Sequence, residues 1–172
     1  MNRRAAAFER EFTRLFREQS PVLLRYVNRL AGDPELAADI VQETFVKLYQ
    51  RGDLPDDARA WLVTVALNLV RDERRTASRR DLLLERHAPH ETAAGPPDLE
   101  LLEEEQRQSV RVALLELAER DREMLLLKHA GYSYREIATV LDLAEASIGT
   151  MLARATASFH AAFSARNTVP ER

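Results

Sequence analysis

The chain has 172 residues, of which 45% are hydrophobic and 31% charged, and it contains no cysteine. This composition suits one or two small globular domains and excludes a disulfide scaffold, a thiol nucleophile and a cysteine-ligated metal site within the chain. The first residues lack a signal-peptide core, and no run of about 18 uncharged apolar residues could span a membrane. We therefore expect a cytoplasmic protein without membrane insertion.

The net charge of −3 is distributed unevenly along the chain. Residues 1–80 carry a net charge of +3, residues 81–110 carry −6, and residues 111–172 are neutral. Because the acidic residues are concentrated in the middle, the overall value does not argue against nucleic-acid binding by the flanking parts.

Apolar residues recur at spacings of three and four, and no segment alternates with the period of two that is typical of a strand. The fold is therefore predicted to be all-α. Four helices are predicted in the first half of the chain. The first covers about residues 5–19, and the second runs from Pro21 to Ala31-Gly32, where it ends. The third begins at the Asp33-Pro34 cap, and the fourth covers about residues 58–75. The residues expected to face the core are Phe8, Phe12, Leu15, Phe16, Leu24, Val27, Leu30, Leu36, Ile40, Val41, Phe45, Leu48, Trp61, Leu62, Val65 and Leu69.

The helical pattern is lost over residues 78–97, which contain Gly95-Pro96-Pro97. This segment is predicted to be an acidic, flexible linker between two small helical domains at residues 1–77 and 98–165, followed by a tail at 166–172.

The second domain is predicted to contain a helix after Asp98 and another at about residues 120–130. Ser133 and Glu136 then form a capping box at the start of a short helix that ends near Leu141. A three-residue turn separates it from a helix at about 145–163, and this arrangement is typical of a helix-turn-helix. The residues of this last helix expected to face the core are Ile148, Leu152, Ala155, Phe159 and Phe163.

Two blocks of residues carry a family resemblance. The first block is Asp39-Ile-Val-Gln42-Glu43-Thr-Phe45 followed by Arg59-Ala-Trp61-Leu62, Ala66, Asn68 and Asp72, and the second is Glu136-Ile-Ala138 with Leu141. In order and spacing they resemble an extracytoplasmic-function (ECF) sigma factor of the bacterial sigma-70 family over about residues 8–163. The resemblance implies a helical initiation factor with a region 2-like bundle and a region 4-like helix-turn-helix. The first domain would bind core RNA polymerase and open the promoter at the minus-ten element, and the second would read the minus-thirty-five element.

The resemblance also implies three groups of site residues. The polymerase-binding group lies at i, i+3 and i+4, so its members share one exposed helical face. Cations are needed where DNA phosphates are bound, and arginines are frequent at the end of the helix predicted for the minus-ten element. The polymerase-binding group is Asp39, Gln42 and Glu43; the minus-ten group is Asn68, Arg71, Asp72, Arg74 and Arg75; the minus-thirty-five group is Lys128, Arg135, Ser147, Thr150 and Arg154.

The sequence departs from the family pattern in the two DNA-binding helices. Leu67 stands where family members commonly have arginine, and Gly149 and Met151 stand at positions that are commonly basic. Because phosphate contacts dominate DNA affinity, we expect weak binding to the minus-thirty-five element. The alternative is that the smooth face of the last helix packs on a protein partner.

Other functions stay open at this point. A sigma-like decoy that binds an anti-sigma factor would explain the depleted recognition helix, and a stand-alone helix-turn-helix regulator would explain only residues 111–163. The expected partners are core RNA polymerase, promoter DNA and an anti-sigma factor. No cofactor or enzymatic activity is expected, since no glycine-rich phosphate loop or catalytic spacing is present. His87 and His90 are interpreted as solvated linker residues, and no metal is assigned.

Overall fold

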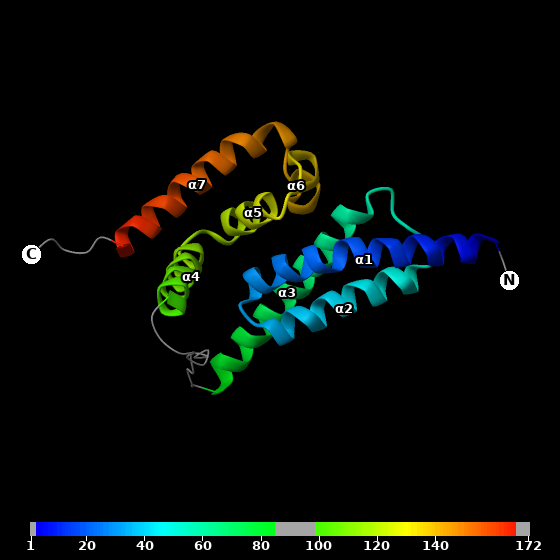
Figure 1. Cartoon of the computed structure of the whole chain (residues 1–172), viewed down its shortest axis with the longest axis horizontal. Coiled ribbons are helices and arrows are strands. Elements are labelled where there is room, and N and C mark those ends of the chain that lie inside the picture. The colour runs from blue at the N-terminus through cyan, green and yellow to red at the C-terminus, as the bar shows by residue number, and fades with distance from the viewer. Residues whose placement is uncertain (1–2, 85–98, 168–172) are drawn as a thin grey trace, which may run out of the picture.

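The computed structural model describes residues 3–84 and 99–167, and over these residues it contains seven α-helices and no strand (Figure 1). The all-α fold class is therefore confirmed. The helices are α1 (Arg3–Ala31), α2 (Pro34–Arg51), α3 (Ala58–Leu84), α4 (Leu99–Leu115), α5 (Glu119–His129), α6 (Tyr134–Leu141) and α7 (Glu145–Asn167).

Helix α1 is one continuous helix, and the predicted break at Pro21 was wrong. Proline inside a helix costs about 3 kcal/mol because it removes one backbone hydrogen bond. The helix nevertheless continues, since Leu15 before the proline and Leu23 and Val27 after it are all buried where α1 packs on α2 and α3. Phe16, which was expected to face the core, is 44% exposed instead.

The turn from α1 to α2 was predicted correctly. Gly32 ends α1 with φ at +76°, a left-handed conformation that glycine adopts without strain. The Asp33 carboxylate then accepts hydrogen bonds from the backbone N–H groups of Glu35 (2.9 Å) and Leu36 (3.1 Å), and Pro34 occupies the first turn of α2. These contacts satisfy N–H groups that have no partner within the helix.

Helix α3 is covered on two sides. The sequence had predicted only one buried stripe for this helix. It packs on α1 and α2 on one side and on α6 on the other. Trp61, Val65 and Leu69, which were predicted to be core, are only half-buried. The fully covered residues of α3 are Ala60, Leu62, Val63, Ala66, Leu67 and Val70.

Helix α3 also extends to Leu84 and therefore continues into the segment 78–97 that was predicted to be linker. Gly95-Pro96-Pro97, His87 and His90 lie outside the described residues.

The two halves of the chain are packed against each other. One hydrophobic cluster runs from residues of α1, α2 and α3 into α5, α6 and α7, and α4 packs on α7. The described helices form an elongated molecule, with the start of α1 and the end of α7 at opposite sides (Figure 1). The region between the halves is therefore an interface, which we call the interdomain interface.

The predicted helix-turn-helix is confirmed, and its first helix, α6, begins at the predicted capping box. The Ser133 hydroxyl accepts from the Glu136 backbone N–H, and the Glu136 carboxylate accepts from the Ser133 backbone N–H at 2.7 Å. Asp142 ends α6 with φ at +53°. Helix α7 then places Ile148, Leu152 and Ala155 in the interior, as predicted.

Candidate functional site

The predicted polymerase-binding residues form an exposed face of α2. Asp39, Gln42 and Glu43 are all exposed, and Glu43 Oε1 lies 3.0 Å from Lys47 Nζ one turn later. No other described element covers these residues, so the face is available to a partner.

An apolar groove of about 880 Å³ lies beside this face, between α1 and α2, and Gln42 is one of its lining residues. Phe16 (44% exposed), Leu24 (39%), Val46 (39%) and Tyr49 (52%) form much of its wall. Clustered exposed apolar side chains are typical of a protein interaction site. The sequence did not reveal this groove, because Phe16 and Leu24 continue the helical spacing of the core residues.

Two arginines near the basic end of α3 are paired with acids of α5. Arg71 forms a two-point ion pair with Glu123, with Nε–Oε1 and Nη2–Oε2 distances of 3.1 and 2.7 Å. Arg74 Nη1 lies 2.9 Å from Glu119 Oε1, and Arg74 Nη2 donates to the Leu30 carbonyl at the end of α1. Two arginines that were predicted to bind DNA are therefore neutralised by acids of the second half of the chain.

Glu123 is the most deeply buried charge among the described residues, with an exposed fraction of 0%. Removing the partner of a buried ion pair costs about 3–5 kcal/mol, because a charge is left in a poorly hydrated site. The hydrogen-bonded pair with Glu123 raises the pKa of Arg71. Glu123 was not identified from the sequence, although its spacing of three and four from Leu126 and Leu127 places it on the apolar stripe of α5.

Two buried tyrosines lie in the same interface. Burial raises the pKa of Tyr132 to about 12 and raises the pKa of Tyr26 further, with the negative charge of Glu123 as a second cause for Tyr26. The Tyr26 hydroxyl is buried and has no hydrogen-bond partner in the described part of the chain. The interdomain interface thus combines a continuous hydrophobic cluster with buried polar groups and ion pairs.

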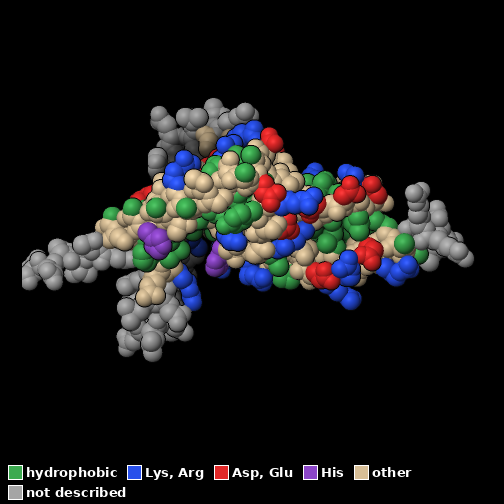
Figure 2. All heavy atoms as spheres, turned by 90° about the horizontal axis from the view of Figure 1, so that it is seen from above, with side chains coloured by type: hydrophobic (Ala, Val, Ile, Leu, Met, Phe, Trp, Pro, Cys, Tyr) green, Lys and Arg blue, Asp and Glu red, His purple; other side chains and the backbone are tan. Residues whose placement is uncertain are grey.

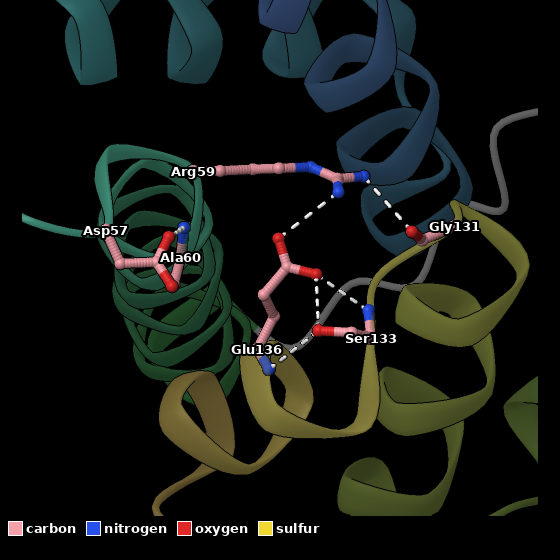
Figure 3. A network of polar contacts seen from close by, with 6 residues as sticks. All are labelled: Asp57, Arg59, Ala60, Gly131, Ser133 and Glu136. Atoms are coloured by element: carbon pink, nitrogen blue, oxygen red, sulfur yellow. Dashed lines mark hydrogen bonds and ion pairs between the residues drawn. The ribbon is translucent and has the colours of Figure 1, made fainter.

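A third ion pair closes the other end of the interface (Figure 3). Arg59, near the start of α3, reaches across to Glu136, with an Nη1–Oε1 distance of 3.2 Å, and to the carbonyl of Gly131 at 3.3 Å. Its guanidinium also lies 4.1 Å from the centre of the Tyr132 ring. Glu136 therefore makes two sets of contacts. Its Oε1 atom pairs with Arg59, and its Oε2 atom accepts hydrogen bonds from the backbone N–H and hydroxyl of Ser133.

Two of these arginines end one stripe of α3. Arg59, Val63, Leu67 and Arg71 are each four residues apart, a spacing that places them on the same helical face. Val63 and Leu67 are buried between the charged ends, with exposed fractions of 0% and 1%. Leu67 therefore places an apolar residue at the centre of this stripe.

The remaining predicted minus-ten residues lie on the exposed side of α3. Asn68, Asp72 and Arg75 are exposed, and Arg75 Nη2 lies 3.1 Å from Asp72 Oδ1. The structure therefore divides the predicted group into three accessible residues and two that are paired within the interdomain interface.

The predicted minus-thirty-five residues all lie on the surface of the helix-turn-helix, on α5, α6 and α7. The Lys128 ammonium lies 4.9 Å from the centre of the Tyr134 ring, while Arg154 is exposed on α7. Seen from above, the ridge of the molecule along α7 is mostly backbone and uncharged side chains, with few basic ones (Figure 2). The surface is as poor in cations as the sequence predicts.

No metal cluster and no membrane-spanning helix are found within residues 3–84 and 99–167. No group of three histidine or acidic side chains in these ranges could hold an ion. None of the helices there is long and apolar enough to cross a bilayer.

Two family models match the chain, and their ranges coincide with its two halves. Sigma-70 region 2 matches residues 15–80, and Sigma-70, region 4 matches residues 107–158. The ECF RNA polymerase sigma factor SigL of Mycobacterium tuberculosis is 36% identical over 154 residues, covering 86% of either chain. The ECF RNA polymerase sigma factor BldN of Streptomyces coelicolor is 31% identical over 160 residues, covering 88% of this chain and 60% of BldN.

Two solved structures share the arrangement of both halves. CnrH, in complex with the cytosolic domain of CnrY, has a TM-score of 0.66 and 26% identity over 94% of this chain and 93% of CnrH. The sigma factor RpoE of Bartonella quintana, in complex with the anti-sigma factor NepR, has a TM-score of 0.68 and 23% identity, covering 90% of this chain and 97% of RpoE. The second likeness concerns the fold alone.

Proposed function

The chain belongs to the ECF sigma factors of the bacterial sigma-70 family, and we propose that it docks on core RNA polymerase through the exposed face of α2 and then opens to engage a promoter. The family consists of transcription initiation factors rather than enzymes. The observation that carries the proposal is the contrast between the exposed α2 face and the two arginines of α3 that are paired with acids of α5. We propose that this action takes place in the cytoplasm, where bacterial polymerase works.

We assign polymerase docking and minus-ten recognition to residues 1–77 and minus-thirty-five recognition to residues 98–165, which residues 78–97 connect. Asp39, Gln42 and Glu43 supply polar contacts for the polymerase, and the adjacent groove receives its apolar side chains. An interface with a hydrophobic centre and a polar rim is the usual design of a protein–protein contact.

The test of polymerase docking is a double charge reversal, Asp39→Lys with Glu43→Lys. We expect the affinity for core polymerase to fall about 100-fold, because like charges would meet across the contact and cost several kcal/mol. Fluorescence anisotropy of the labelled chain measures the affinity, and circular dichroism checks that the helices persist. Glu73→Lys, an exposed reversal on α3, is the matched control. Unchanged affinity of the double variant would remove this assignment.

For promoter opening, we propose that Arg71 and Arg74 exchange their carboxylate partners for DNA phosphates. Asn68 and Asp72 would contact the non-template bases, and Arg75 would add a phosphate contact. Extruding a base costs a few kcal/mol, so a cation-rich helix end is needed to offset it. Run-off transcription with core polymerase and a genomic promoter library tests this function, and no specific initiation above core polymerase alone would contradict it.

We further propose that an anti-sigma factor holds the chain in its closed form. The support is the covered state of Arg71 and Arg74, together with the likeness to CnrH, whose structure was solved with the cytosolic domain of CnrY. Affinity purification from the source organism, followed by mass spectrometry, distinguishes the partners. Recovery of polymerase supports initiation, whereas recovery of an anti-sigma factor without polymerase under inducing and non-inducing conditions favours the decoy.

A further inference from the structure

A second cavity lies at the end of the interdomain interface where Arg74 contacts Leu30. It has a volume of about 660 Å³ and is lined by residues 28–32 at the end of α1, by residues of α4 between 106 and 115, and by Arg122 of α5. None of the predicted polymerase-binding or DNA-binding residues is among its lining residues. Its volume lies within the range of about 300–1000 Å³ that is typical of small-molecule sites.

The cleft is strongly cationic. Four arginines line it, namely Arg29, Arg107, Arg111 and Arg122, and none of the lining residues in the described part of the chain is acidic. Arginine is the side chain that best matches carboxylates and phosphates, because its planar fork can donate two parallel hydrogen bonds. The lining therefore favours an anion.

Arg122 lacks an acceptor for its Nε atom although it is buried. Its side chain is only 9% exposed, and Nε is buried without a hydrogen-bond partner in the described part of the chain. The two acids whose charges act on its pKa are engaged elsewhere, because Glu119 is paired with Arg74 and Glu123 with Arg71. Burial, followed by the repulsion of Arg74, lowers the Arg122 pKa. Because buried polar groups in native proteins are nearly always hydrogen-bonded, Arg122 is a lining cation whose hydrogen bonds within the described part of the chain are incomplete.

The walls of the cleft also include apolar side chains. Val110 and Leu115 are 38% and 58% exposed, and Leu30 and Leu114 lie beside them. A site that combines a buried cation with an apolar wall suits a molecule with an anionic head and an apolar body. The cleft is small for a protein partner, because 12 described residues line it, whereas a stable protein interface takes about 20–30 residues on each side.

We propose that this cleft binds a small organic anion, with its carboxylate or phosphate head on Arg122 and its body against α4. The two walls belong to different halves of the chain, so the site is complete only while the interdomain interface is closed. A ligand that binds only the closed form increases its population. The anion would therefore keep Arg71 and Arg74 away from DNA, and this regulatory step rests on the function proposed above.

Calorimetric titration of the full chain tests the binding itself. Decanoate provides a carboxylate on an aliphatic chain, AMP provides a phosphate on a planar base, and inorganic phosphate provides the head group alone. We expect one of the two organic anions to bind with a Kd at least about tenfold lower than that of inorganic phosphate. If neither organic anion binds more tightly than inorganic phosphate, the proposal is wrong.

Three variants locate the site. Arg122→Gln and Arg111→Gln should each raise the Kd of the organic anion about tenfold, and Arg111 is exposed, so that variant leaves the packing intact. Arg120→Gln removes an exposed cation of α5 that does not line the cleft, and it should leave the Kd unchanged. An equal loss of affinity in Arg120→Gln would point to diffuse charge attraction and contradict a specific site.

Run-off transcription tests the regulatory step separately. The organic anion should lower initiation by the wild-type chain about fivefold and leave initiation by Arg111→Gln unchanged. Equal inhibition of both proteins would overturn the regulatory step, while the titration would still stand for the site. Failure of the wild-type chain to initiate without any anion would instead contradict the proposed function.

Discussion

The α2 face and the arginine pair Arg71 and Arg74 of α3 belong to the same half of the molecule, yet only the α2 face is without a partner from the second half. Asp39 and Glu43 are exposed beside an open apolar groove. Arg71 and Arg74 are paired with acids of α5. The comparison indicates that the chain can meet a protein partner as it stands, whereas it must break ion pairs before these two arginines can meet DNA.

This difference suggests an order of events. The docking on polymerase proposed above would require no rearrangement of α2, and its free energy would be available to open the interdomain interface. A coupling of about 1–3 kcal/mol between two sites is typical of proteins with two conformations. Promoter contacts by α3 would then depend on prior binding of polymerase.

The largest effect on the interface is expected from Leu67→Arg. The substitution places a charge among the buried residues at the centre of the α3 stripe, where an unpaired charge costs several kcal/mol. The two halves should separate, and the radius of gyration measured by small-angle X-ray scattering should increase. Circular dichroism should show that helix content is retained. A compact Leu67→Arg chain would contradict the assignment of Leu67 to the interface.

A smaller and more specific opening is expected from Glu119→Ala combined with Glu123→Ala. The variant removes the carboxylates that neutralise Arg74 and Arg71, so both arginines become available to phosphates. We expect the free chain to bind a single-stranded minus-ten oligonucleotide about tenfold more tightly in an anisotropy assay.

The matched control for this variant is Glu116→Ala, which removes an acid that pairs with Arg166 rather than with α3. Its affinity for the oligonucleotide should stay at the wild-type value. If the double variant also keeps the wild-type affinity, the ion pairs do not restrict access to DNA.

Glu136→Gln should have a modest effect at the other end of the interface. Glutamine can still close the capping box with Ser133, so the variant isolates the ion pair with Arg59. Because this pair is only partly buried, we expect the free energy of unfolding to fall by about 0.5–1 kcal/mol in urea denaturation. Arg135→Gln, a neighbouring exposed change, should leave the unfolding free energy unaltered, and a larger loss in that control would show that the ion pair is not responsible.

The smallest effect concerns α7. Gly149→Lys adds a cation to the depleted recognition helix, and a Cβ atom there would lie 3.6 Å from the Tyr134 ring, an ordinary contact. We expect affinity for minus-thirty-five DNA to rise about threefold and the slope of log K against log salt to steepen by about one phosphate contact. A gel-shift series at several salt concentrations measures both, and an unchanged slope would mean that this face does not approach DNA.

The sequence predicted those parts of the fold that depend on local chemistry. The Asp33-Pro34 cap, the Ser133 capping box and the burial of Ile148 and Leu152 were all confirmed, because each depends on residues within one or two helical turns. The break at Pro21 was predicted wrongly, since tertiary packing on both sides of a proline can outweigh its local cost.

The interdomain interface could not be predicted from helical spacing. Arg71 and Glu123 are 52 residues apart in the chain, and an arginine at the end of a basic helix is equally compatible with DNA, solvent or a carboxylate. The sequence did contain one local indication of a buried ion pair. Glu123 interrupts the apolar stripe of α5, and a charge on a buried stripe needs a partner. That the predicted residues contact polymerase and DNA stays a prediction.

The central claim is that the interdomain interface is closed in the free chain and opens on polymerase. The most direct test is to measure the distance between the two halves of the chain in both states. The chain has no cysteine, so Arg25→Cys on α1 and Thr156→Cys on α7, both at exposed positions, can be labelled as a unique pair. Single-molecule energy transfer should give one short distance for the free chain and a longer one once core polymerase and promoter DNA are added. An unchanged distance on the polymerase complex would contradict the account.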